Sequence, residues 1–131
     1  MSGETDLKKL LKSMNPVLHE GTYVFCTPEA FTVIHQDDLI MTFNEAEGTT
    51  IIVRKETANK LNLKYDFVAA WITLTIHSSL NAVGLTAAIS SALAEEEISC
   101  NVVAGFYHDH LFVNFRDAEK AMEILNSISR Q

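Results

Sequence analysis

The chain has 131 residues, of which 47% are hydrophobic and 21% are charged. These fractions are typical of a folded globular protein and exclude an intrinsically disordered one. The length fits one ordinary domain or two very small ones that share a core. The formal net charge is −7, and no run of Lys and Arg forms a basic stripe. Nucleic acid is therefore not an expected partner.

The N-terminus and the two cysteines predict a cytoplasmic protein. The first six residues hold no basic segment with an apolar core behind it, so they do not form a secretory signal. No apolar run reaches the roughly 20 residues that span a bilayer, so a membrane is not an expected partner. Cys26 and Cys100 lie in strand-like apolar runs, which predicts two reduced, buried thiols. A disulfide or a reactive thiol is the alternative.

The first half of the chain predicts a short helix followed by three strands. Asp6 can cap a helix whose leucines recur at helical spacing, and Asn15-Pro16 ends it. Residues 22–26, 38–43 and 49–54 are rich in β-branched and aromatic side chains and are separated by turn residues. Each of these segments is a predicted strand.

A soft boundary follows in the polar segment 62–66, just after a short helix predicted at residues 56–61. We therefore divide the chain into an N-terminal unit, residues 1–66, and a C-terminal unit, residues 67–131. No Gly/Ser-rich linker or low-complexity tract separates them. The two units are expected to pack together.

The second half begins with a strand and a helix. Ile72, Leu74 and Ile76 alternate with polar residues, which predicts a strand with one buried face. Apolar residues then recur at helical spacing over residues 83–96, which predicts a helix.

A hairpin and a final helix complete the second half. Residues 100–107 and 110–115 are predicted strands, joined by a turn at residues 108–110. Asp117 can cap the last helix. The inner face of that helix would consist of apolar residues: Ala118, Ala121, Met122, Leu125 and Ile128.

This order is the ferredoxin-like βαββαβ unit without its last strand. The first half is also incomplete, because it starts with a helix where a strand belongs. Two incomplete units in one chain predict that strands are exchanged, each half completing the sheet of the other. The predicted fold class is α+β, with two ferredoxin-like units whose antiparallel sheets carry helices on one face.

Residues 71–129 resemble an ACT domain, the small amino-acid-binding module of metabolic regulators. The resemblance is carried by five stretches, at residues 71–76, 81–84, 93–99, 106–113 and 121–125. Residues 16–25 resemble the N-terminal half of small stand-alone bacterial proteins with paired ACT units. Those proteins are similar to the regulatory tail of aspartate kinases and to cytosolic arginine sensors.

The resemblance implies a ligand site at the loop between the first strand and the first helix. In such families the effector lies between this loop of one unit and a strand of a neighbouring unit. The loop often reads Asp-x-x-Gly, and here it reads Asn81, Ala82, Val83, Gly84. Backbone N–H groups at a helix start, with their partial positive charge, suit the carboxylate of an amino acid. The alternative is structural: Asn81 only caps the helix and Gly84 only packs against a strand.

Asp109 is the candidate partner for the ammonium of the ligand. The resemblance places an aspartate at the same turn, although a turn also favours Asp for local hydrogen bonding. Carbonyl groups between Val102 and Ala104 are a second candidate for the ammonium. A metal site formed by His108 and His110, with His77 as a third ligand, is the alternative, and solvated turn histidines are the favoured interpretation. We predict no metal site.

The sequence predicts no catalytic residues and no cofactor. It contains no nucleophile elbow and no phosphate-binding loop. The leading hypothesis is a non-enzymatic, allosteric regulator that binds a small amino acid as a homodimer or higher homo-oligomer, with a metabolic enzyme as a possible partner. The second hypothesis is a ligand-free ACT-like module for oligomerisation or protein interaction.

Overall fold

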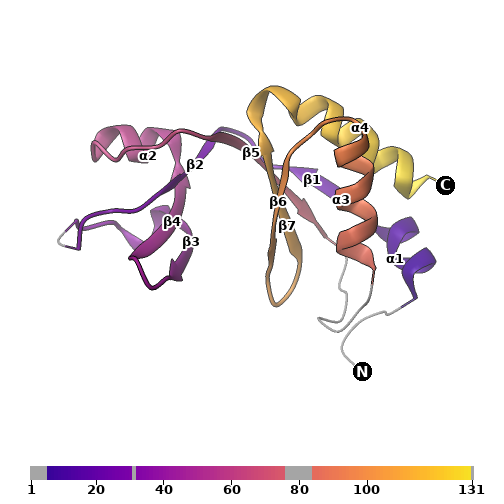
Figure 1. The fold of residues 1–131 in the computed structure, drawn as a ribbon, viewed down its shortest axis with the longest axis horizontal. Coiled ribbons are helices and arrows are strands. Elements are labelled where there is room, and N and C mark those ends of the chain that lie inside the picture. The colour runs from indigo at the N-terminus through magenta and orange to yellow at the C-terminus, as the bar shows by residue number, and fades with distance from the viewer. Residues whose placement is uncertain (1–5, 31, 76–83, 131) are drawn as a thin grey trace. The chain divides into compact units, whose positions relative to one another are not determined.

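The computed structural model describes residues 6–30, 32–75 and 84–130. The chain divides into two compact units. The central unit is Gly21–Ala69, and the terminal unit combines Met1–Glu20 with Ala70–Gln131. Figure 1 shows the elements of both units.

The central unit is a small antiparallel sheet with one helix. Its elements are β2 (Tyr23–Cys26), the 3-10 turn η1 (Gln36–Asp38), β3 (Leu39–Asn44), β4 (Thr49–Arg54), α2 (Lys55–Lys60) and the first two residues of β5 (Val68–Leu74). The strand order is β3-β4-β2-β5. The strands predicted from residues 22–54 are therefore present.

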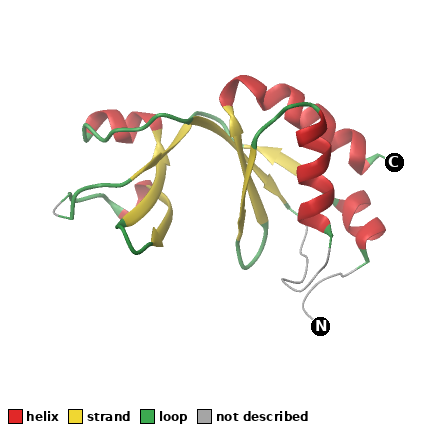
Figure 2. Ribbon diagram, viewed as in Figure 1, coloured by secondary structure: helices red, strands yellow, loops and turns green. Residues whose placement is uncertain are grey.

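The terminal unit is a second antiparallel sheet with helices on one face. Its elements are α1 (Leu7–Ser13), β1 (Pro16–Leu18), the rest of β5, α3 (Leu85–Glu95), β6 (Cys100–Ala104), β7 (Asp109–Asn114), the 3-10 turn η2 (Phe115–Asp117) and α4 (Ala118–Ser129). The strand order is β1-β5-β7-β6. Figure 2 shows the three helices gathered beside these strands.

The predicted exchange of strands is confirmed in both units. β1 comes from the first half of the sequence and pairs with β5, with Pro16 opposite Leu74. It occupies the place of the last strand that the second half lacks. The first residues of β5 pair with β2, with Val68 opposite Val24, and supply the fourth strand of the central unit. The α+β fold with two ferredoxin-like units is thereby confirmed.

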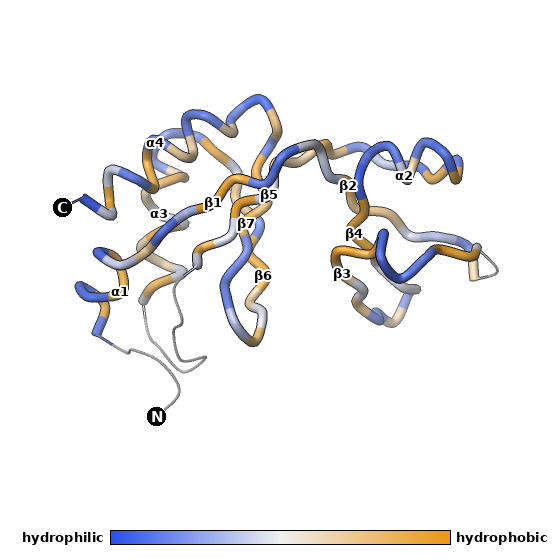
Figure 3. Tube along the Cα trace, turned by 180° about the vertical axis from the view of Figure 1, so that it is seen from behind, coloured by the Kyte–Doolittle hydropathy of each residue, from blue (hydrophilic) through white to orange (hydrophobic). Residues whose placement is uncertain are grey.

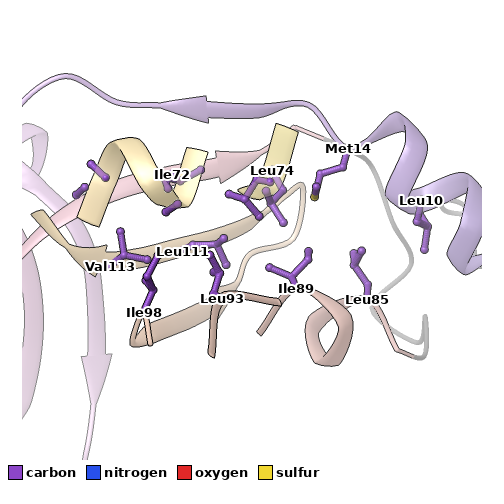
Figure 4. Close-up of a cluster of buried hydrophobic side chains, with 14 residues drawn as sticks. Leu10, Met14, Ile72, Leu74, Leu85, Ile89, Leu93, Ile98, Leu111 and Val113 are labelled. Atoms are coloured by element: carbon purple, nitrogen blue, oxygen red, sulfur yellow. The ribbon is translucent and has the colours of Figure 1, made fainter. Parts of the chain in front are cut away.

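The larger core lies between the helices and the sheet of the terminal unit (Figure 4). Ile72 and Leu74 of β5, predicted to share the buried face, are both in it. The other buried members come from α1, β5, α3, β7, α4 and the segments beside them: Leu10, Met14, Ala70, Leu85, Ile89, Leu93, Ile98, Leu111, Val113, Ala118, Ala121 and Leu125. Burial of a Leu or Ile side chain contributes about 1.5–3 kcal/mol, so this core holds α1 as well as α3 and α4 to the sheet.

A smaller core belongs to the central unit. Ile51 and Val53 of β4 are buried with Val24, Cys26 and Ala58. β4 is accordingly one of the hydrophobic stretches of the chain in Figure 3. Leu39, Tyr65 and other partly buried side chains close its margins.

The ends of the helices differ from their prediction in one case. Asp6 caps α1 as predicted, because its carboxylate accepts the N–H groups of Lys8 and Lys9. Asp117 stands at the N-cap position of α4, but its side chain makes no capping bond. The side chain of Asn114 accepts the N–H of Arg116 instead and begins the preceding 3-10 turn.

Both cysteines are free thiols, as predicted. Cys26 is buried, and burial raises its pKa. Cys100 is partly buried, and burial raises its pKa to about 11, so the thiol stays protonated at neutral pH. In the described parts of the chain no helix is long and apolar enough to cross a membrane.

Candidate functional site

The β6–β7 hairpin carries three of the predicted site residues, and its turn lies earlier than predicted. The prediction of a turn at residues 108–110 was wrong. The turn is formed by residues 105–108, where the N–H of Gly105 donates to the carbonyl of His108 at 2.9 Å. Ala104 and Asp109 then pair across the two strands. Gly105 is the sequence signal for this turn, since glycine favours turn positions.

Strand alternation places Val102, Ala104 and Asp109 on one face of the sheet. Asp109 and Leu111 are two residues apart in β7, so their side chains lie on the same face of the sheet, and Leu111 is in the core beneath the helices. Val102 stands opposite Leu111 and packs against the same core. The side chains of all three predicted residues are therefore on the helix-covered face.

Asp109 is a half-buried carboxylate at the end of this face. Among the described residues, none donates a side-chain hydrogen bond to it or forms an ion pair with it. Desolvation raises its pKa, while the neighbouring His110 and His108 lower it by a smaller amount. A carboxylate kept partly from water without a partner is costly, so this position is suited to a cationic group from outside the chain.

Gly84 begins α3 and needs to be glycine. Its φ of +96° lies in the left-handed region, which strains any residue with a Cβ. We expected it inside the first turn, but it is the N-cap, because a left-handed residue cannot continue a right-handed helix. A Cβ built on Gly84 would lie 3.4 Å from Cδ2 of Leu7. The neighbour of Gly84 is thus helix α1 and not a strand, and it lies at an ordinary contact distance.

The start of α3 and the β6–β7 turn lie at the same end of the terminal unit (Figure 1). The predicted residues Gly84, Ala104 and Asp109 are in this way brought to one end of the fold. The other three predicted loop residues, Asn81, Ala82 and Val83, lie outside the described residues.

The opposite face of the same sheet carries a cluster that the sequence analysis missed. The His19 ring stacks on Trp71 with centroids 3.5 Å apart and planes 11° apart. Thr73 Oγ1 lies 2.7 Å from His19 Nε2 and 3.0 Å from His110 Nδ1. The indole N–H of Trp71 donates to the same His110 Nδ1 at 3.1 Å. We call these four residues the Trp71 cluster.

The hydrogen bonds of the Trp71 cluster fix the tautomer of His110. An indole N–H can only donate, so Nδ1 of His110 must carry a lone pair. The Thr73 hydroxyl then donates to the same nitrogen and shares its single lone pair with the indole N–H, and His19 donates to Thr73. Protonation of His110 at Nδ1 would remove the lone pair that accepts these hydrogen bonds. The pKa of His110 is lowered, first by burial and then by His108, and Asp109 opposes the shift.

The signal for this cluster was present in the strand pattern. Trp71 and Thr73 alternate with the core residues of β5, and His110 alternates with those of β7. Their proximity could not be predicted from the sequence, since it depends on pairing between distant strands.

In the described ranges, no three His, Cys, Asp or Glu side chains form a metal-binding group. His77, the third histidine of the metal alternative, is not among the described residues.

Two protein-family models match the chain, and both describe the ACT domain. One matches residues 2–70 and the other residues 67–127. No curated protein matches the sequence.

The solved structures that are similar include a protein of unknown function from Vibrio cholerae, called a possible transport protein. It is 43% identical, with 94% of this chain and 95% of that chain covered and a TM-score of 0.81. The allosteric aspartate kinase of Clostridium acetobutylicum is 11% identical over 88% of this chain and 34% of its own, with a TM-score of 0.61. E. coli aspartokinase III, in complex with aspartate and ADP, is 10% identical over 88% and 33%, with a TM-score of 0.62. The matched third of each kinase shares the fold of this chain.

Proposed function

The chain belongs to the ACT domain family, and from this premise we propose that it is a regulatory protein that binds a small amino acid. ACT domains are regulatory, non-catalytic modules. In this proposal the ligand lies at the end of the terminal unit between the start of α3 and the β6–β7 turn. The protein is not an enzyme and works in the cytoplasm.

The environment of the Asp109 carboxylate is the observation that supports an amino acid as the ligand. Its carboxylate is half-buried and has no partner among the described residues, so a ligand ammonium would supply the missing charge. The ligand carboxylate would meet the backbone N–H groups that precede and begin α3, including those of Asn81 to Gly84. The carbonyls of Val102 and Ala104 are the second acceptors for the ammonium.

A thermal-shift screen of the twenty amino acids tests this proposal. At a ligand concentration 100 times Kd, binding adds about 2.7 kcal/mol to the free energy of unfolding. We expect at least one amino acid to raise the melting temperature of the wild type and of Glu119→Gln, an exposed control on α4. Asp109→Asn should lose the response. A full response in Asp109→Asn, or none in the wild type, would contradict the proposal.

A ligand-free interaction module is the second candidate, and the left-handed backbone of Gly84 favours it. This backbone conformation accounts for the glycine without any ligand. Under both candidates we propose a homodimer or higher homo-oligomer, which could dock on a metabolic enzyme, with β6 at an end of the strand order open to a second copy. Light scattering with and without amino acids separates the two. Assembly that never responds to amino acids supports the module.

A further inference from the structure

The helices of the terminal unit carry a surface that the proposed ligand site does not use. α1, α3 and α4 gather beside one sheet, and we call them the helix layer (Figure 2). α4 packs against both of the other helices. Two grooves cross this layer, one of about 350 Å³ between α1 and α4 and one of about 340 Å³ between α3 and α4.

The groove between α1 and α4 is basic. Lys8, Leu11 and Lys12 line it from one face of α1, and Ile128 lines it from α4. The seven residues of α1 include three of the ten Lys and Arg residues of the chain. Lys8 and Lys12 are exposed, and neither forms a salt bridge with any residue in the described ranges. Their charges are therefore open to a partner.

The groove between α3 and α4 is acidic. Glu95 and Glu96 line it from α3, and Glu123 lines it from α4, above the smaller side chains Ala92, Ile124, Ser127 and Ile128. Glu96 forms an ion pair with Lys120 at 3.4 Å. Glu95 and Glu123 are exposed and have no such partner among the described residues. Glu95 also stands at the negative end of the α3 dipole, so a cation from outside would stabilise it.

The two grooves meet at α4, because Ile128 lines both of them. Ile124 and Ile128 are half-buried and form an apolar ridge between the basic side and the acidic side. A two-fold axis that runs along α4 would place this ridge on the same ridge of a second copy. The basic groove of each copy would then face the acidic groove of the other, and every contact would occur twice.

We propose that the helix layer binds a second copy of this chain, with Lys8 and Lys12 of each copy against Glu95 and Glu123 of the other. An acidic partner would leave the acidic groove unpaired, and a basic partner would leave the basic groove unpaired. A second copy satisfies both grooves at once. This interface uses neither the edge strand β6 nor the ligand site, so it does not depend on the proposed function.

The charge pairs account for a measurable part of the affinity. Each exposed ion pair changes Kd by no more than roughly fivefold, and the two-fold axis doubles the number of pairs. Reversal of both lysines, or of both glutamates, should therefore weaken association at least about tenfold. Two copies with a net charge of −7 also repel one another, and salt screens this repulsion together with the ion pairs. Charge reversal is for this reason a cleaner test than salt.

Sedimentation velocity over a range of protein concentrations tests the interface with two variants. The α1 variant carries Lys8→Glu and Lys12→Glu, and the α3–α4 variant carries Glu95→Lys and Glu123→Lys. Each variant alone should lose one step of association, from dimer to monomer, or from tetramer to dimer if β6 also pairs. An equal mixture of the two should associate as the wild type does, because opposite charges then face one another at both ends of the interface.

Controls with the same net charge carry reversals outside both grooves. Lys9→Glu with Lys60→Glu matches the α1 variant, and Glu47→Lys with Glu119→Lys matches the α3–α4 variant; all four residues are exposed. The controls should associate like the wild type, and far-UV circular dichroism checks that every variant is folded. Four results would overturn the proposal: a monomeric wild type at millimolar concentration, full association of either groove variant alone, equal loss in the controls, or no recovery in the mixture.

Backbone amide shifts of the ¹⁵N-labelled wild type give a readout that needs no variant. Dilution should move signals of residues 8–12, 92–96 and 123–128. Shifts confined to residues 100–104 would assign association to β6 and contradict the inference. The amino-acid screen of the wild type and of Asp109→Asn is independent of both results, so the ligand proposal and this interface can fail separately.

Discussion

Replacement of Thr73 by valine should destabilise the protein through the Trp71 cluster. Thr73 is 6% exposed, so its polar side chain is buried. Its hydroxyl joins His19 and His110 at 2.7 Å and 3.0 Å. Valine keeps the shape and removes both hydrogen bonds.

The magnitude follows from the two lost bonds. Each contributes roughly 0.5–1.5 kcal/mol, and water cannot readily replace a hydroxyl in so buried a position. We expect the free energy of unfolding to fall by about 2 kcal/mol. Trp71 still donates to His110, so the cluster is weakened but not abolished.

Urea unfolding measures this change, and the chain offers a local probe. Trp71 is the only tryptophan, so its fluorescence reports directly on the cluster. The midpoint should fall while the slope m stays constant, since the exposed surface is unchanged. Thr42→Val on β3, where the threonine is exposed, is the matched control and should change stability by less than about 0.5 kcal/mol. An unchanged midpoint and an unchanged Trp71 spectrum in Thr73→Val would refute the assigned network.

Three further predictions concern single positions. The pKa of His110 is lowered in the folded state, so its contribution to stability is present above pH 6.5 and is lost as pH falls below this value towards the folded pKa. His110→Gln should reduce the dependence of stability on pH in this range, by at most about 1.4 kcal/mol per pH unit. The pKa of Asp109 is raised, so its contribution is present below pH 3.8 and lost as pH rises. Asp109→Asn should therefore unfold at higher urea than the wild type at pH 7; a lower midpoint would show that the carboxylate has a partner. Gly84→Ala should cost about 1–2 kcal/mol because of its left-handed backbone, and a neutral result would show that α3 can begin otherwise.

Local patterns predicted most of the elements because burial imposes a period on the sequence. Leu85, Ile89 and Leu93 recur at helical spacing, and all three are buried residues of α3. β1 escaped prediction because it has only three residues, two of them exposed, and shows no alternation. The hairpin turn was misplaced by the histidines at 108 and 110, which suggested a polar turn, whereas Gly105 decides the geometry.

The candidate site was less accessible to sequence reasoning than the fold. Asp109 was chosen from a family resemblance. Only the structure, in which Asp109 pairs with Ala104, shows that its carboxylate is half-buried and forms no ion pair with a described residue. Such sites depend on strand register, which local sequence patterns do not specify.

Each half of the sequence is incomplete because the two halves exchange strands. The composition and short length of β1 suit it to this exchange. Pro16 has no N–H to donate, so it is suited to a strand at the edge of a sheet. β1 pairs only with β5 among the described strands, and Val17 and Leu18 are exposed beside it. A short edge strand that begins with proline discourages pairing with a further strand. The same segment also carries His19 to Trp71, where the N–H of His19 donates to the Trp71 carbonyl at 2.9 Å. The exchanged strand thus both completes the sheet of the terminal unit and builds the Trp71 cluster on its second face.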